Sequence, residues 1–501
     1  MPEHDLPEYP TVRAAEGLLR GRRHGGHAVF RGIPYARPPV GALRFAAPAP
    51  VEPWDGVREA AEFGPTPPQS GPVAAAPTEG TGWLTLNVHT PHPGSAGLPV
   101  LVWIPGGGYI AAASDDPMYD ATALASAGLV VVSLNYRAGA EGFALLDGVP
   151  ANRALLDQIA ALHWIRRNIA AFGGDPDRVT VAGQSAGAGS IAALLTMEPV
   201  RGLFRRAVTH SVPGSHCTPA LAAEVTAALA GRLGTAPTAA ALSTVDPWHL
   251  AEALTALSAD LPAHGERWGA FAQSGAAVCP VVDGEVLPEV PWPALASGRA
   301  AGIDLLVGHT RDEFRLFTVM AGLLGTFTEQ DAATALDLFA PQPDGPDAYL
   351  AANPQASPDE LLEAVRSDAL FRMPSLQLAE ANTAAGGTSY LFELALPSPA
   401  LGGVLGACHS LDVPLAFGTL DSPIGRQLLG DTPSPEARAV SAELHRAWVA
   451  FATTGDPGWP AFQAEGQLTR VLDARPRTIR YPEQDARRIW AGHHPAAFDL
   501  R

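Results

Sequence analysis

Short runs of apolar and β-branched residues, each bounded by turn-forming residues, recur along the chain. They lack the strict alternation of apolar and polar positions that a half-exposed strand would show. Runs of this kind are typical of strands buried on both faces of a parallel sheet. The pattern predicts strands at residues 100–104, 129–134, 179–182, 303–307 and 390–396, and a further run at 203–208 that leads into an edge of the sheet.

A segment with helical periodicity lies between the runs at residues 129–134 and 179–182. Within residues 152–172 the apolar side chains recur every three or four positions, which predicts an amphipathic helix. Gly173 and Gly174 end this helix, and Asp175-Pro176 turns the chain into the next strand. The result is a strand–helix–strand unit, for which a right-handed crossover is expected.

Two long Ala/Leu-rich stretches interrupt the strand pattern. They cover residues 220–261 and 326–380 and are helical in character. A Gly- and Pro-rich region at residues 17–57 has the composition of small β-hairpins. We therefore predict an α/β protein with a central, mostly parallel sheet flanked by helices. Helical insertions, roughly residues 220–265 and 320–385, are expected to cover one end of the sheet.

Composition and charge narrow the possible functions. Of 501 residues, 47% are hydrophobic and 17% are charged, which allows a large core. The formal net charge of -18 argues against a nucleic-acid partner and against an anionic membrane surface. The three cysteines form no CxxC pair, and there is no apolar run of about 20 residues that would predict a membrane span. A cytoplasmic protein is expected.

The sharpest local motif is Gly183-Gln184-Ser185-Ala186-Gly187, which follows an apolar strand and precedes small residues that open a helix. In such a turn the serine adopts a strained conformation at the positive end of the helix, where its hydroxyl is exposed as a nucleophile. A nucleotide-phosphate site is the alternative for a glycine turn in an α/β protein. Neither Gly-x-Gly-x-x-Gly nor Gly-Lys-Ser/Thr occurs here, so the alternative is disfavoured.

A second glycine cluster, Gly106-Gly107-Gly108, follows the strand at residues 100–104. Acyl transfer develops negative charge on a carbonyl oxygen, which fixed backbone N–H groups can stabilise. Consecutive glycines expose such donors, although a flexible loop would have the same composition.

Longer motifs resemble the carboxylesterase/cholinesterase family, the type-B carboxylesterases. The similarity extends from Phe30 to about Gly458, and bacterial members of compact length, such as para-nitrobenzyl esterases, are the most similar. The resemblance implies one α/β-hydrolase domain over residues 1–501, with the two insertions forming a lid and an acyl pocket. The matching segments are 30–45 (FRGIPYARPPVGALRF), 135–137 (NYR), 152–158 (NRALLDQ) and 168–176 (NIAAFGGDP).

The resemblance also implies a catalytic triad. Residues 308–313 (GHTRDE) resemble the acid motif of the family, and residues 407–414 (ACHSLDVP) resemble its histidine motif. Ser185 would be the nucleophile, His409 the base that activates it, and Glu313 the carboxylate that orients the imidazole. The neighbouring Asp312 is a competing candidate for the acid. The implied oxyanion donors are the N–H groups of Gly107, Gly108 and Ala186, and the implied supporting residues are Gln184 and Ser211.

Three departures from the family pattern stand out. Pro105 replaces the usual histidine before the glycines, which leaves the oxyanion donors intact but changes the support of the loop. Gln184 replaces the usual glutamate, which removes a negative charge beside His409 and makes cationic substrates less favoured. Thr81-Gly82-Trp83 replaces Glu-Asp-Cys, so the disulfide of secreted relatives is absent and an ionic partner for Arg44 is in doubt.

These features predict a serine carboxylesterase that cleaves apolar esters of modest size through an acyl-enzyme on Ser185. No cofactor and no metal are implied, and the chain is expected to be a monomer or a small homo-oligomer. Two alternatives stay open. A triad-bearing enzyme could instead be an acyltransferase or a cyclase of specialised metabolism, or the chain could be a non-catalytic scaffold member of the fold.

Overall fold

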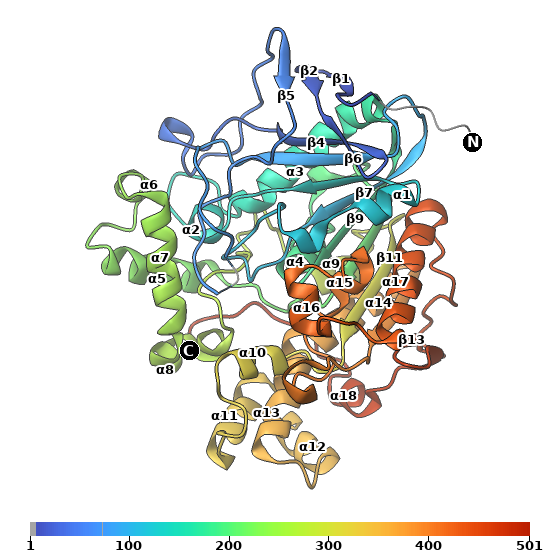
Figure 1. Cartoon of the computed structure of the whole chain (residues 1–501). Coiled ribbons are helices and arrows are strands. Elements are labelled where there is room, and N and C mark those ends of the chain that lie inside the picture. Colours follow the sequence, from blue (N-terminus) through green and yellow to red (C-terminus); the bar gives the residue numbers. More distant parts are fainter. Residues whose placement is uncertain (1–6, 73) are drawn as a thin grey trace.

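A large sheet forms the centre of the molecule in a computed structural model, which describes residues 7–72 and 74–501 (Figure 1). Its strands run in the order β14-β13-β12-β11-β10-β9-β7-β8-β6-β4-β3. From β13 to β8 every neighbouring pair is parallel, and antiparallel strands complete both ends. The strands are β3 (Arg22–His24), β4 (His27–Pro34), β6 (Thr85–Thr90), β7 (Leu98–Ile104), β8 (Val130–Leu134), β9 (Gly174–Gln184), β10 (Arg206–His210), β11 (Asp304–Thr310), β12 (Ser389–Leu394), β13 (Leu468–Leu472) and β14 (Arg477–Arg480).

The predicted strands at 100–104, 129–134, 179–182, 303–307 and 390–396 correspond to β7, β8, β9, β11 and β12. The edge position predicted after residues 203–208 is wrong. The strand formed there, β10, lies in the interior of the sheet, parallel to β9 on one side and to β11 on the other. The order of strands in a sheet depends on long-range pairing, which the short apolar run does not encode; Arg206, at the start of β10, donates from its guanidinium to Ala452 O at 3.0 Å.

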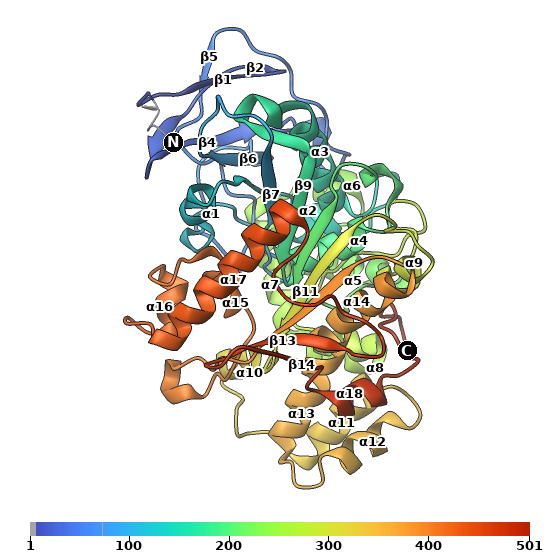
Figure 2. The same cartoon turned by 90° about the vertical axis from the view of Figure 1, so that its right-hand side faces the viewer.

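Each face of the sheet carries its own hydrophobic core, as successive side chains of a strand point to opposite faces. Along β7, Val100, Val102 and Ile104 join a core that contains residues of α3 (Arg153–Asn168) and α4 (Ala186–Leu194). Leu101 and Trp103 join the other core, with residues of α15 (Asp412–Phe417) and α17 (Pro435–Thr454). Figures 1 and 2 show α3 and α17 on opposite faces of the sheet.

The two predicted insertions are helical. The first contains α5 (Pro219–Arg232), α6 (Ala239–Leu242), α7 (Pro247–Ala259) and α8 (Gly265–Trp268). The second contains α10 (Arg315–Met320), α11 (Glu329–Phe339), α12 (Gly345–Ala352), α13 (Pro358–Ser367) and α14 (Met373–Ala384). A π-helical turn over Asp368–Arg372 joins α13 to α14. In Figure 1 the first group appears in green and α11–α13 in yellow and orange.

Shorter elements complete the chain. Strands β1 (Thr11–Ala14), β2 (Gly17–Arg20) and β5 (Val57–Glu59) form a separate small sheet, so the predicted hairpins near the N-terminus are present. None of the helices in the described part of the chain has the length and apolar character needed to cross a membrane. The remaining helices are α1 (Thr122–Ser126), α2 (Gly139–Phe143), α9 (Pro291–Ala296), α16 (Pro423–Leu429) and α18 (Gln484–Ile489).

Two ion pairs fix the loop after β8. Arg137 and Asp157 are fully buried and 2.7 Å apart, and they hold the loop against α3. Arg44 forms a second pair with Glu141 of α2 at 2.6 Å and donates to two backbone carbonyls of the first insertion. Arg44 therefore has an ionic partner even though Thr81-Gly82-Trp83 supplies no acid.

Removing one member of the buried pair should strongly destabilise the fold. We expect Asp157→Ala to lower the free energy of unfolding by about 3–5 kcal/mol because Arg137 would remain charged and buried. Asp485→Ala, which removes an exposed partner of Arg488, should cost only about 0–1 kcal/mol. Urea unfolding followed by fluorescence would compare the two variants, and equal losses would contradict a structural role for the buried pair.

Candidate active site

The turn between β9 and α4 places Ser185 in a conformation that few residues adopt. Its backbone has φ 54° and ψ −127°. A Cβ on Gly183 would lie 2.7 Å from the carbonyl carbon of Gly187, and a Cβ on Gly187 would lie 2.1 Å from Ile104 O. Only glycine fits at either position. The sharp strand–turn–helix therefore has the backbone geometry of a nucleophile elbow.

The second glycine cluster packs directly against this turn. A Cβ on Gly106 would lie 2.6 Å from Gln184 O and 3.3 Å from Ser185 Cβ. Gly107 and Gly108 have φ values of 129° and 60°, which aim their peptide groups differently from a strand. Among the described residues, no group accepts a hydrogen bond from the N–H of Gly107, Gly108 or Ala186. These donors remain available for an oxyanion.

Pro105 does not leave the glycine loop unsupported. Its carbonyl oxygen accepts a hydrogen bond from the buried Tyr136 hydroxyl at 2.7 Å. Gly107 O accepts from the backbone N–H groups of Ile110 and Ala111 at 3.1 and 3.0 Å, which closes the loop. The loop is therefore held through its carbonyls.

Glu313 and His409 meet although 95 residues lie between them in the sequence. Glu313 Oε2 lies 2.5 Å from His409 Nδ1, and both side chains are buried. Glu313 Oε1 accepts from the Ser211 hydroxyl at 2.6 Å and from the Thr310 N–H at 2.8 Å. Burial alone would raise the pKa of Glu313, but the adjacent His409 and these hydrogen bonds together lower it. The carboxylate is thus ionised and its geometry is fixed.

Asp312, the competing acid, has a different position. Its carboxylate accepts a hydrogen bond from the Ala407 N–H at 2.7 Å, and its backbone pairs with Cys408. It therefore braces the loop that carries His409, while the imidazole itself contacts Glu313. Cys408 is fully buried, and burial raises the pKa of its thiol to about 12, so it is no thiolate nucleophile.

The other nitrogen of His409 is engaged by Gln184. The Gln184 amide nitrogen lies 2.9 Å from His409 Nε2. Since Nδ1 faces the ionised Glu313 and donates to it, Nε2 of the neutral imidazole is the acceptor of the amide N–H. No hydrogen bond joins the Ser185 hydroxyl to His409 in the described part of the chain. Such catalytic hydrogen bonds are often long in the free enzyme and form when substrate binds.

Two aromatic rings that the sequence did not single out flank His409. The ring centroid of Phe371 lies 4.6 Å from that of the imidazole, and Phe317 lies at 5.2 Å. Phe371 belongs to the π-helical turn before α14, and Phe317 belongs to α10. Both come from the second insertion, and they give the site an apolar, uncharged wall.

Among the described residues, one group of side chains has ligand atoms close enough to hold a metal. These are His309, Glu393 and Glu483, whose ligand atoms lie within 4.8 Å of one another. The Arg311 guanidinium lies 2.7 Å from Glu393, and burial and the adjacent Glu483 raise the pKa of Glu393 well above its usual range. A proton shared between the two carboxyls, with Arg311 beside them, accounts for this cluster better than a cation.

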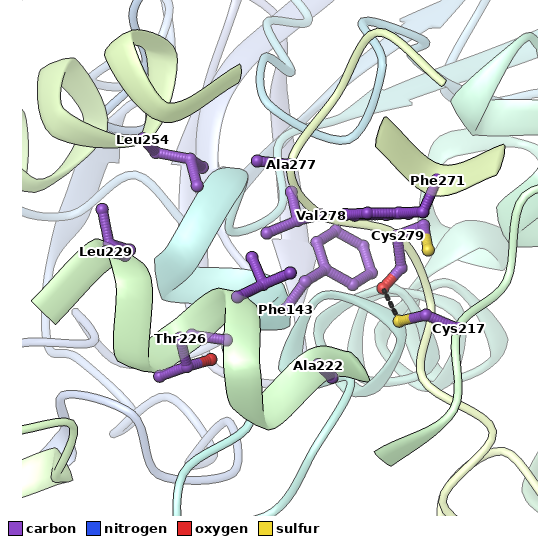
Figure 3. Close-up of a pocket in the computed structure, with 12 residues that line it drawn as sticks. Phe143, Cys217, Ala222, Thr226, Leu229, Leu254, Phe271, Ala277, Val278 and Cys279 are labelled. Carbon is purple, nitrogen blue, oxygen red and sulfur yellow. Dashed lines mark hydrogen bonds between the residues drawn. The ribbon is translucent and has the colours of Figure 1, made fainter. Parts of the chain in front are cut away.

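A small apolar cavity lies in the first insertion, between α2, α5 and α7 (Figure 3). Its volume is about 10 Å³, close to the space that a single water occupies, so it is too small for a substrate. Phe143, on its wall, packs edge-to-face on Tyr109 of the glycine loop with centroids 5.2 Å apart. The cavity therefore lies behind the loop and outside the reacting centre.

The parallel sheet and the elbow between β9 and α4 are those of an α/β-hydrolase, as predicted. The chain belongs to the carboxylesterase family, whose model matches residues 8–486. It is a carboxylic ester hydrolase.

Individual relatives are similar along almost their whole length. The para-nitrobenzyl esterase of Bacillus subtilis is 36% identical over 96% of this chain and 98% of that protein. The phenmedipham hydrolase of Pseudarthrobacter oxydans is 35% identical over 92% of this chain and 95% of its own. The solved carboxylesterase of Geobacillus stearothermophilus superposes with a TM-score of 0.84 at 34% identity, covering 96% of this chain and 99% of its own.

The contact between Gln184 and His409 leads to a prediction about pH dependence. In Gln184→Glu a carboxylate would face the imidazole and stabilise its protonated form, which cannot act as a base. We expect the acidic limb of the kcat/KM profile to move to higher pH by about one unit. Gln184→Met, which keeps the length of the side chain but adds no charge, should move it less. Profiles of Gln184→Glu and wild type that coincide would contradict the contact.

Proposed function

We propose that Ser185, His409 and Glu313 form the catalytic triad of this esterase. The observation that carries the proposal is the buried 2.5 Å contact between Glu313 and His409, whose other nitrogen faces the elbow through Gln184. Glu313 fixes the tautomer that leaves His409 Nε2 free of a proton, which is what a general base requires. Ser211 and Thr310 hold Glu313 in place and are positioning residues in this scheme.

The proposed reaction has two steps. The amide of Gln184 withdraws from His409 Nε2, and the Ser185 hydroxyl gives its proton to that nitrogen while its oxygen attacks the ester carbonyl. The N–H groups of Gly107, Gly108 and Ala186 stabilise the oxyanion, and His409 returns the proton to the leaving alcohol. Water activated by His409 then releases the acid from Ser185.

We infer that the substrates are uncharged esters with an apolar or aromatic part. Phe317 and Phe371 flank His409, and Gln184 contributes no charge where a glutamate is usual. The name of the Bacillus subtilis relative, para-nitrobenzyl esterase, agrees with an aromatic substrate. We also propose that the helical insertions form the lid and acyl pocket of a single domain.

A cytoplasmic enzyme is proposed as well, monomeric or a small homo-oligomer and without a nucleic-acid partner. Cys217, Cys279 and Cys408 are all free and buried, which suits a reducing compartment.

Replacement of the nucleophile tests the central proposal. Ser185→Ala should reduce kcat for p-nitrophenyl butyrate by at least about 10⁴-fold because no acyl-enzyme can form. A fluorophosphonate should label the wild type once, on Ser185, as seen by mass spectrometry of peptides. Ser190→Ala, which changes the serine within α4, should still be labelled. An active Ser185→Ala enzyme would exclude this nucleophile.

A pair of conservative changes separates the two candidate acids. Glu313→Gln should lower kcat by about 10³–10⁴-fold because an amide cannot hold His409 in the required tautomer. Asp312→Asn keeps an oxygen for the Ala407 N–H and should change kcat less than about tenfold. Steady-state kinetics on p-nitrophenyl butyrate would measure both, and the reverse order would assign the acid to Asp312.

A further inference from the structure

Exposed apolar side chains are concentrated beside the active site. The described residues include ten large hydrophobic side chains that are exposed, and four of them fall within residues 317–324, on α10 and the turn after it. Two more lie on the segment 401–404, which Arg315 of α10 holds through a hydrogen bond to Val404 O at 3.1 Å. We call this surface the α10 patch; it consists of Phe317, Met320, Leu323, Leu324, Leu401 and Val404.

The α10 patch begins at the reacting centre. The Phe317 ring lies 5.2 Å from the His409 imidazole and stacks on Phe371 at 5.9 Å with an angle of 7° between the rings. Met320 is one helical turn farther along α10 and is 54% exposed. Phe317 and Met320 therefore extend apolar surface from His409 outward along α10, in contrast to scattered exposed residues, which need no explanation.

The charge around the α10 patch favours an uncharged occupant. Arg315, on the same helix, is paired with Glu363 of α13, so its charge is compensated. An alkyl chain would lose water on such a surface without leaving any ionic group unpaired.

The position of His409 indicates which half of the ester lies there. In the proposed mechanism His409 Nε2 delivers its proton to the oxygen of the leaving alcohol, so this oxygen must lie beside the imidazole. The oxyanion donors come from β7 and the elbow instead. The first carbon atoms of the alcohol are therefore directed toward the rings that flank His409, and Phe317 is the ring that continues to solvent.

We propose that the α10 patch binds the alkyl chain of the alcohol half of the substrate, so that the enzyme prefers esters of long, uncharged alcohols. This inference rests on the proposed function, since it uses the role of His409 as the proton donor.

The test compares octyl acetate with butyl acetate, both kept below their solubility limits, by titrating the acid released. A variant with Met320→Ser, Leu323→Ser and Leu324→Ser removes the outer part of the patch. A half-buried CH₂ contributes about twofold to kcat/KM, so four extra carbons should contribute about 16-fold, of which the outer part of the patch supplies the larger share. We expect the octyl/butyl ratio of kcat/KM to fall by about tenfold in this variant. Leu350→Ser, which changes an exposed leucine of α12, should leave the ratio unchanged.

Three results would overturn the proposal. The first is an octyl/butyl ratio that does not change in the triple variant. The second is a loss confined to the acyl series, p-nitrophenyl octanoate against butyrate, which would place the acyl chain on the patch. The third is a wild-type rate that rises only above the solubility limit, which would indicate adsorption to an aggregated substrate. Failure of the proposed function would be recognisable separately, because Ser185→Ala would then still hydrolyse both acetates.

Discussion

The close approach of the backbone at the carboxyl ends of β7 and β9 is the constraint on which the site depends. Gly187 has no room for a side chain because Ile104 O occupies that space, and Gly106 has none because Gln184 O does. These contacts press the glycine loop against the elbow, so the proposed nucleophile and the proposed oxyanion donors share one rigid unit. The positive φ of Ser185 is a strain of about 1–3 kcal/mol that the packed sheet on both sides maintains.

The parallel order of the sheet explains why residues distant in the sequence meet. The carboxyl ends of the neighbouring strands β9, β10 and β11 lie side by side. Hydrogen bonds link the residues at and just beyond these ends: Ser185 N–H donates to His210 O at 2.9 Å, and Ser211 N–H donates to Gly308 O at 2.7 Å. A buried contact of 2.7 Å between His210 and Asp412 ties the histidine loop to β10. In parallel sheets the functional groups gather at the carboxyl ends of the strands, whatever their order in the chain.

Much of this arrangement could be predicted from the sequence because it depends on local rules. Apolar runs predicted β7, β8 and β9, and the helical periodicity of apolar residues predicted α3. The spacing of small residues around Ser185 predicted the elbow. The pairing of Glu313 with His409 was available only through the family motifs, since nothing local to either residue indicates the other. The family motif favoured Glu313 over the neighbouring Asp312, but without it the two acids could not be told apart, because the choice depends on which side chain points toward the histidine loop.

The contacts that the insertions make could not be predicted from local sequence patterns. Phe317 and Phe371 are ordinary apolar residues of helical stretches, and only the packing of α10 and the π-helical turn brings both rings to His409. The interior position of β10 was missed because strand order is a long-range property that a short apolar run does not encode. The ionic partner of Arg44 was missed for the same reason, because Glu141 lies on α2, far from Arg44 in the sequence.

The replacement of glutamate by Gln184 changes the resting state of the site in a way that charge alone does not describe. A carboxylate can only accept hydrogen bonds, whereas the Gln184 amide donates to His409 Nε2, whose lone pair takes the proton of Ser185 in the proposed mechanism. The lone pair of the proposed base is therefore occupied, and in the proposed mechanism the amide has to move away before attack. Once the imidazole is protonated, the amide can turn and offer its oxygen instead. Gln184 thus competes with the nucleophile before the reaction and can stabilise the imidazolium during it, a combination that neither glutamate nor an apolar residue provides.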